Sequence, residues 1–247
     1  MNCKVSLDDS ENDCVLKGRE LRAAVSEAGM RVAQKAKEIY GNDAYFLERA
    51  VGLLARTILC KAGEKGSATP EMGNKILLII TYFQGCGFTE RLIAEGQYAK
   101  AAAALKQDFE ILTRIKEIDA GEARSGRTPQ MRHAPKGSPR LYGELNKVAH
   151  PSNEVLLHRH LDQIVKSEIR GVSPLPVFRE STLRGEFKLH CWLCYSICHA
   201  SVQVLLENYG EDDVFVVDCI TRFAQLQDSG LASGILIAFS SESEAIQ

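Results

Sequence analysis

The sequence predicts an all-α protein: a single domain over residues 1–247, folded as a bundle of about six to eight helices. Apolar residues recur every three or four positions through most of the chain, which is the period of a helix packed on one side. Glycines and cap-proline pairs separate these segments. The chain is long enough, and with 45% hydrophobic residues apolar enough, to bury a sizeable core. We expect its ends, residues 1–14 and 240–247, to be flexible.

Four helices are expected in the first half of the chain, over residues 15–40, 43–62, 70–84 and 98–120. Thr69 followed by Pro70 is a typical helix start, since the threonine can cap the first turn and proline loses no hydrogen bond there. Gly85-Cys86-Gly87 is interpreted as a break after the third helix. In the fourth helix only Asp108 interrupts the apolar seam. We expect it at the edge of the helix interface; the alternative is that it points into a polar site.

The second half is expected to hold helices over residues 139–149, 154–169 and from about 181 to 209. Ser138-Pro139 starts the first of these, and Pro151 ends it because proline disfavours helical geometry in the preceding residue. Residues 214–227 are ambiguous. Val-Phe-Val-Val favours a strand locally, whereas the wider apolar spacing favours a helix; we choose the helix because no partner strand is evident.

A candidate site lies in the stretch from Ser138 to Asn153, where polar residues gather beside strong helix signals. Tyr142 and Asn146 share one face of the short helix. His150 follows at its C-terminal end, where the helix dipole favours a protonated imidazole, so it suits acid–base chemistry or a phosphate contact. The alternative is structural: His150 caps backbone carbonyls, and Tyr142 and Asn146 fasten two helices together.

A basic loop over residues 123–138 precedes this helix. From Arg124 to Arg140 there are five arginines or lysines, one histidine and no acid, among glycine, proline and serine. A mobile segment of this kind can reach phosphates. We expect Arg132 and Arg140 to contact an anionic ligand. The alternative is a solvated surface loop, and the net charge of −2 argues against wholesale coating of nucleic acid.

Cys191, Cys194 and Cys198 fall on one face of the last long core helix, which could present three thiolates to a metal ion. No second cysteine pair or paired histidines stand at a spacing that completes four ligands. Free cysteine also packs as a small hydrophobe, and these three continue an apolar stripe with Phe187 and Val202. We interpret them as core residues and expect no metal and no cofactor.

Residues 142–152, Tyr-Gly-Glu-Leu-Asn-Lys-Val-Ala-His-Pro-Ser, resemble a segment of a family of uncharacterised bacterial all-helical proteins. That segment has the form aromatic-x-x-Leu-Ser-x-x-x-His-Pro-Ser, and Asn146 stands where it has serine. Some of these proteins are similar to the HEPN group of helical ribonucleases and nucleotide-binding modules. The resemblance implies a bacterial helical protein, and His150 belongs to the matching segment.

HEPN ribonucleases carry an arginine a few residues before a histidine, and two pairs in this chain match that spacing. They are Arg184 with His190, and Arg127 with His133. In such an enzyme the arginine would hold the scissile phosphate, and the histidine would move a proton from a 2′-hydroxyl.

The N-terminal segment lacks the apolar core of a secretory signal, and the run from Ile76 to Phe83 is far shorter than the about 20 residues that span a bilayer. We therefore expect a cytoplasmic protein without membrane contact. The leading hypothesis is a binding or interaction module for an anionic or nucleotide-type ligand. The alternative is a HEPN-like metal-independent ribonuclease of a defence or toxin system that acts on RNA, so whether the chain is an enzyme stays open. A third hypothesis is a scaffold that forms a homodimer.

Overall fold

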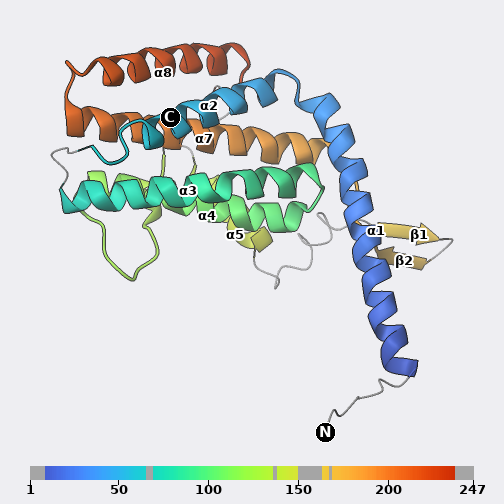
Figure 1. Cartoon of the computed structure of the whole chain (residues 1–247). Coiled ribbons are helices and arrows are strands. Elements are labelled where there is room, and N and C mark those ends of the chain that lie inside the picture. Colours follow the sequence, from blue (N-terminus) through green and yellow to red (C-terminus); the bar gives the residue numbers. More distant parts are fainter. Residues whose placement is uncertain (1–8, 65–68, 136–137, 150–162, 167–168, 237–247) are drawn as a thin grey trace, which may run out of the picture.

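The computed structural model describes residues 9–64, 69–135, 138–149, 163–166 and 169–236. In these residues the chain forms an all-α multi-helix bundle, as the sequence predicts (Figure 1). Its seven α-helices there are α1 (Asp9–Tyr40), α2 (Asn42–Leu59), α3 (Pro70–Ala94), α4 (Tyr98–Asp119), α5 (Pro139–Ala149), α7 (Glu180–Tyr209) and α8 (Val214–Ala232). A 3₁₀ turn, η1 (Met131–His133), follows α4, and β1 (Gln163–Lys166) and β2 (Ile169–Val172) form a hairpin.

Helix α7 is the central element of the core. It packs against α1, α2, α3, α4 and α8, and its buried side chains extend from Leu183 to Leu205. Two aromatic contacts anchor it. The ring of Phe187 stacks on Tyr40 of α1 with 3.6 Å between centroids, and Trp192 stacks on Phe109 of α4 at 6.3 Å. The other helices are therefore positioned by the faces they turn toward α7.

By length and composition α3 and α7 are both apolar enough to cross a membrane, although the two helices use their apolar residues differently. In α7, 72% of the apolar stretch is buried inside the protein, so its hydropathy reflects its core position. In α3 only 33% of the corresponding stretch is buried. Helix α3 therefore keeps an apolar face on the protein surface.

The expected break at Gly85-Cys86-Gly87 is wrong, because α3 continues through both glycines to Ala94. Tyr82, Cys86 and Thr89 keep the helical spacing of buried side chains across this point. Each glycine costs about 1 kcal/mol of helix propensity relative to alanine. Burial of these side chains against α4 and α7 outweighs that cost, so the helix persists.

The expected helix over residues 154–169 is wrong in its last part. Gln163–Lys166 and Ile169–Val172 pair there as antiparallel strands. Both segments are rich in β-branched residues, which favour strands, and two residues separate them, the usual length of a hairpin turn. Residues 150–162 lie outside the described residues, and with them the candidate residue His150 and the expected helix stop at Pro151.

The other expected helices are confirmed, with small changes at their ends. Residues 9–14, expected to be flexible, are the first residues of α1. The ambiguous segment after Gly210 is a helix, α8, as chosen. The carboxylate of Asp213 caps it by accepting hydrogen bonds from the amides of Phe215 at 2.9 Å and Val216 at 3.1 Å.

Asp108 was expected at the edge of the α4 interface, and that expectation is wrong. Its side chain is buried and accepts a hydrogen bond from the Thr89 hydroxyl of α3 at 3.1 Å. Burial raises the pKa of Asp108 to about 6, although His190 and the Thr89 hydroxyl favour the charged form. The seam contains an acid because a polar group on the facing helix satisfies it.

The pH dependence of stability should reveal this buried carboxyl. Because its folded pKa exceeds the ordinary value of 3.8, its contribution to stability is full below about pH 4 and is lost as the pH rises through about 6. As the pH rises between those values, the free energy of unfolding of Asp108→Asn should therefore increase relative to that of the natural protein, by at most about 3 kcal/mol. Urea unfolding of both proteins, with exposed Asp228→Asn as control, measures the gain. A difference independent of pH would contradict it.

Close packing at Gly230 gives a second prediction. A Cβ atom there would lie 2.8 Å from the side chains of Leu236 and Phe46. Gly230→Ala should therefore lower the free energy of unfolding by about 1–3 kcal/mol. Gly52→Ala in α2 is the matched control, because nothing lies within 4 Å of its new Cβ. Equal stability of the two variants would contradict the packing of α8.

Candidate functional site

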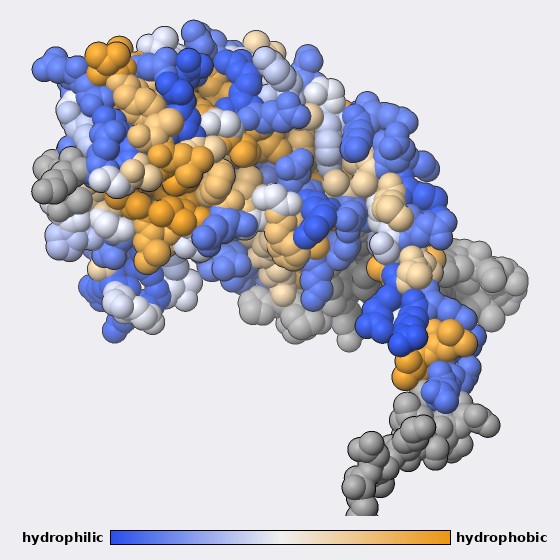
Figure 2. Space-filling view, in the orientation of Figure 1, coloured by the Kyte–Doolittle hydropathy of each residue, from blue (hydrophilic) through white to orange (hydrophobic). Residues whose placement is uncertain are grey.

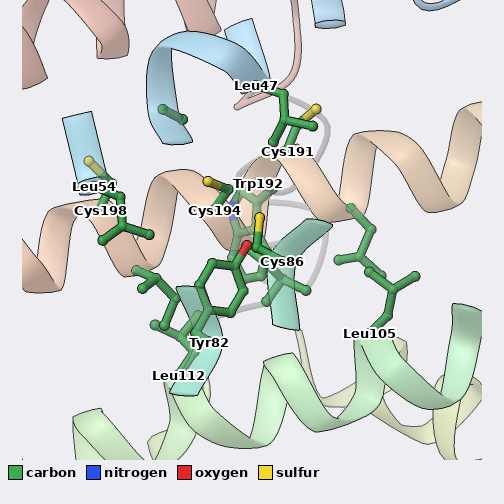
Figure 3. Close-up of a cluster of buried hydrophobic side chains, with 14 of the residues drawn as sticks. Leu47, Leu54, Tyr82, Cys86, Leu105, Leu112, Cys191, Trp192, Cys194 and Cys198 are labelled. Carbon is green, nitrogen blue, oxygen red and sulfur yellow. The ribbon is translucent and has the colours of Figure 1, made fainter. Parts of the chain in front are cut away.

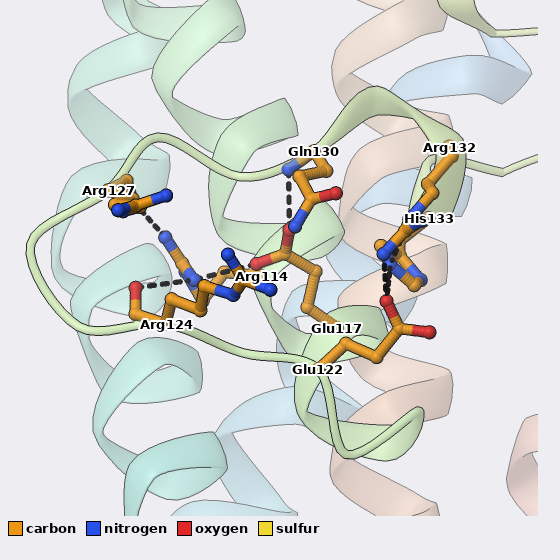
Figure 4. A network of polar contacts seen from close by, with 8 residues as sticks. All are labelled: Arg114, Glu117, Glu122, Arg124, Arg127, Gln130, Arg132 and His133. Carbon is orange, nitrogen blue, oxygen red and sulfur yellow. Dashed lines mark hydrogen bonds and ion pairs between the residues drawn. The ribbon is translucent and has the colours of Figure 1, made fainter.

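The loop that follows α4 is held against that helix by Arg114 and Glu117, two residues of α4 that pair with each other and also bond to the loop backbone. Arg114 and Glu117 stand one turn apart near the end of α4, and 2.6 Å separates Nη1 of the arginine from Oε2 of the glutamate. Arg114 also donates to the backbone carbonyls of Arg124 and Arg127. Glu117, only 1% exposed, accepts a hydrogen bond from the backbone amide of Gln130 (Figure 4). The described part of the basic loop is thus an organised structure.

A second set of contacts holds the far end of the loop. The Glu122 carboxylate pairs with the Arg132 guanidinium and lies 3.3 Å from Nε2 of His133. Nε of Arg132 lies 3.1 Å from the same histidine nitrogen. Arg132, expected to contact an anionic ligand, is therefore paired with a protein carboxylate, although its side chain is still 60% exposed.

Between these two sets of contacts the loop and α4 enclose a cavity of about 320 Å³, which we call the arginine pocket. Its lining residues are Arg114, Glu117, Arg124, Arg127, Thr128, Gln130 and Arg132. Four guanidinium groups and one carboxylate give this lining a net charge of +3. The arginine pocket is therefore positively charged in a chain whose formal net charge is −2.

Arg124 and Arg127 are the two exposed cations of the arginine pocket without a protein counter-ion. In the described ranges no carboxylate lies within ion-pair distance of either guanidinium. Their backbone carbonyls are fixed by Arg114, and Gly126 between them adopts a φ of 72°, which glycine reaches without strain. The backbone is thus fixed while the two charged ends stay available. Guanidinium groups bind phosphate and carboxylate oxygens through paired hydrogen bonds.

The candidate residues of α5 do not join the arginine pocket. Tyr142 donates a hydrogen bond to Oε1 of Glu110 in α4 at 2.7 Å, and burial, followed by Glu110, raises its pKa to about 12. Arg140 is 81% exposed and pairs with Glu144 of its own helix at 3.6 Å, whereas Asn146 is half-buried. Tyr142 therefore fastens α5 to α4, in agreement with the structural alternative for this residue.

The two arginine–histidine pairs are placed differently. Arg184 is exposed and pairs with Glu180 at 2.9 Å, whereas His190 is fully buried, with Nε2 3.7 Å from the Cys86 sulfur. A polynucleotide cannot reach His190 in this fold. Arg127 lines the arginine pocket, but the side chain of His133 is only 12% exposed and faces Glu122.

The three cysteines of α7 are fully buried, as the core interpretation predicts (Figure 3). Burial raises the pKa of Cys191 and Cys198, so both remain neutral thiols. Cys194 faces Cys86 of α3. Hydrogen bonds from Cys194 and His190 lower the pKa of Cys86, whereas that of Cys194 rises. No group of three or more metal-ligating side chains that could hold a metal ion occurs in the described part of the chain.

Sequence reasoning found the basic loop but missed the residues that organise it. Arg114 and Glu117 are an oppositely charged pair three residues apart, at the end of a helix and just before the acid-free loop. That spacing is the signal that could have indicated them. Arg124 belonged to the expected basic segment without being singled out.

Comparisons with protein-family models, with curated proteins and with solved structures found no match to this chain.

Proposed function

We propose that this protein is a binding module for a phosphate-bearing anionic ligand, which occupies the arginine pocket. One observation carries the proposal: two exposed guanidinium groups, Arg124 and Arg127, flank a cavity of net positive charge without a carboxylate partner in the described residues. Protein surfaces usually interleave charges of both signs, so a cluster of unpaired cations favours an external anion.

The pocket is organised before a ligand arrives. Glu117 neutralises Arg114 and orients it, and Arg114 fixes the carbonyls on both sides of the turn at Gly126. A ligand therefore has little loop entropy to remove on binding, which leaves more of the contact energy for affinity. Glu117 acts as a positioning residue, because its buried carboxylate already contacts Arg114 and the amide of Gln130.

The size of the pocket limits the ligand. A volume of about 320 Å³ is at the lower end of the range for small-molecule sites, about 300–1,000 Å³. One phosphate group, or a short chain of them, fits such a volume. A nucleotide would place its phosphates among the arginines and its base outside the cavity.

Substitution of either unpaired arginine should weaken phosphate binding. Inorganic triphosphate, titrated calorimetrically, is the probe, and Arg124→Ala or Arg127→Ala should each raise its dissociation constant about tenfold, since a charge-assisted hydrogen bond contributes about 1.5–3 kcal/mol. Arg140→Ala is the matched control, since it removes the same charge from exposed α5. Equal losses in all three variants would indicate a nonspecific charge effect and would contradict a site at the pocket.

The organising role of Glu117 can be tested separately. Glu117→Gln removes the charge that pairs with Arg114 but keeps an acceptor for the amide of Gln130. Without its charge partner Arg114 is no longer held where it donates to the carbonyls of Arg124 and Arg127, so the loop should loosen from α4. Limited trypsin digestion should then cut after Arg124 and Arg127 faster than in the natural chain, and triphosphate binding should weaken. Unchanged cleavage would show that the ion pair does not hold the loop.

A mixed-sequence single-stranded RNA tests the larger ligand. Binding that depends on Arg124 and Arg127, and that weakens steeply as salt rises, supports a polynucleotide as the phosphate source. RNA cleavage in EDTA that is lost in His133→Ala would replace the binding proposal with a catalytic one.

A further inference from the structure

The outward face of α3 carries a stripe of neutral residues along most of the helix. The residues on it are Gly73, Leu77, Ile80, Thr81, Gln84 and Phe88, which share one side of the helix. Leu77 is 63% exposed and Phe88 is 53% exposed, which is unusual for side chains of this size. Figure 2 shows hydrophobic residues gathered over the surface formed by α2 and α3.

The polar groups of this part of α3 are satisfied elsewhere. The Lys75 side chain, 8% exposed, points inward and pairs with Asp119 at 3.1 Å and Glu207 at 2.7 Å. The Thr81 hydroxyl donates to the carbonyl of Leu77 in its own helix. Between Gly73 and Phe88 the stripe carries no charged residue and no unsatisfied hydroxyl, and Arg91, one turn beyond, lies with its guanidinium 5.9 Å from the centre of the Phe88 ring.

The apolar surface extends sideways from the stripe. An apolar groove of about 310 Å³ lies between α2, α3 and α7, and Ile80 belongs both to its lining and to the stripe. Ile58, Leu59 and Ile76 line the same groove. The exposed apolar area is thus wider than a single helix, and isolated exposed side chains do not explain it.

The spacing of the stripe is symmetric. Positions 73, 77 and 80 precede its midpoint by the same intervals at which 81, 84 and 88 follow it. When α3 lies antiparallel on a second α3, Phe88 faces Gly73 of the partner subunit, Leu77 faces the partner's Gln84, and Ile80 faces the partner's Thr81. A Cβ atom at Gly73 would meet no described residue within 4 Å, so the described surface there leaves room for a ring. The largest side chain of the stripe therefore faces its smallest residue.

We infer that α3 is the contact surface of a homodimer, in which the stripe packs antiparallel on the same stripe of a second copy of this chain. A twofold axis between Ile80 and Thr81 makes the contact self-complementary. A charged residue near the middle of the stripe would lie close to its own copy across that axis, whereas positions 73 to 88 of the stripe are neutral and Arg91 falls opposite position 70 of the second copy. This inference concerns α3 alone and is independent of the arginine pocket on α4.

The small size of the contact indicates the protein concentration at which the dimer should form. A helix of 25 residues at about 1.5 Å per residue offers a face roughly 37 Å long, and with a width of about 10 Å its area is less than half of the about 800 Å² per partner of a stable complex. The dimer should therefore dissociate in the micromolar range. Sedimentation equilibrium of the full chain between about 1 and 200 µM covers this range.

The full chain should approach twice the 27.3 kDa of one copy at the highest concentrations. Leu77→Lys and Phe88→Lys should each raise the dimer dissociation constant more than about tenfold, because each places two charges in the contact. Leu231→Lys is the control, since this leucine is 44% exposed in the last turn of α8, and it should leave the dimer intact.

Gly73→Leu separates association from folding. No described residue lies within 4 Å of a Cβ at this exposed position, and replacing a helical glycine adds helix propensity, so the thermal midpoint should stay or rise while the dimer is lost. Adding Phe88→Ala to Gly73→Leu restores a large residue opposite a small one and should recover association. When an Ile80→Cys variant is mixed with a Thr81→Cys variant and oxidised, mass spectrometry should find position 80 of one copy linked to position 81 of the other.

Three results would overturn the proposal. The first is a chain that remains monomeric at about 200 µM. The second is a dimer that Leu77→Lys, Phe88→Lys and Gly73→Leu all leave unchanged. The third is a monomer that sediments with phosphatidylcholine–phosphatidylglycerol vesicles and loses that binding in Leu77→Lys, because the stripe would then contact lipid.

Discussion

The fold depends on the burial of α7 among the surrounding helices. Its face turned to α2 and α3 carries Cys191, Cys194 and Cys198, and the stacked pair of Phe187 and Tyr40 joins it to α1. Small side chains along that face let the neighbouring helices approach closely, and each buried aromatic ring contributes area that cysteine cannot. Helices α3 and α4 each pack one face against α7. Their opposite faces do not contact α7 and can carry a binding surface.

The arginine pocket follows from this arrangement. Helix α4 turns Leu105, Leu112 and Ile115 toward the core, so Arg114 and Glu117 lie where the following loop leaves the helix. Their ion pair is almost completely shielded on the glutamate side and fixes two loop carbonyls and one loop amide. The loop can then carry exposed cations at fixed positions, which a freely moving basic segment could not do.

The sequence predicted helices correctly where apolar residues recur every three or four positions along the whole segment. The segments that became α1, α4, α7 and α8 were all predicted, and the burial of the three α7 cysteines followed from the apolar stripe that they share with Phe187. It failed where tertiary contacts outweigh local preference. The glycines at positions 85 and 87 suggested a break, but the buried faces of α4 and α7 keep α3 helical on both sides of Cys86. Asp108 looked like an edge residue because its partner Thr89 is on another helix, invisible to a pattern within α4.

The candidate site was predicted only in part, for the same physical reason. The excess of positive charge in the loop is visible in the sequence, but the acids that orient it, Glu117 and Glu122, come before the loop and had no assigned role. Tyr142 was correctly placed on one face of a short helix, yet its hydroxyl is used by Glu110, a contact that only the folded chain brings together. Local charge can thus be counted from sequence, whereas the pairing of charges depends on the packing of helices.

Hydrogen–deuterium exchange with and without inorganic triphosphate tests the central claim most directly, because it locates the ligand on the chain. The account predicts slower exchange confined to residues 121–133, strongest around Gly126 and Gln130, and absent when Arg124 and Arg127 are both alanine. Protection that appears instead at the larger cavity of about 490 Å³ beside Lys75 and His199, or no protection at ligand saturation, would contradict it.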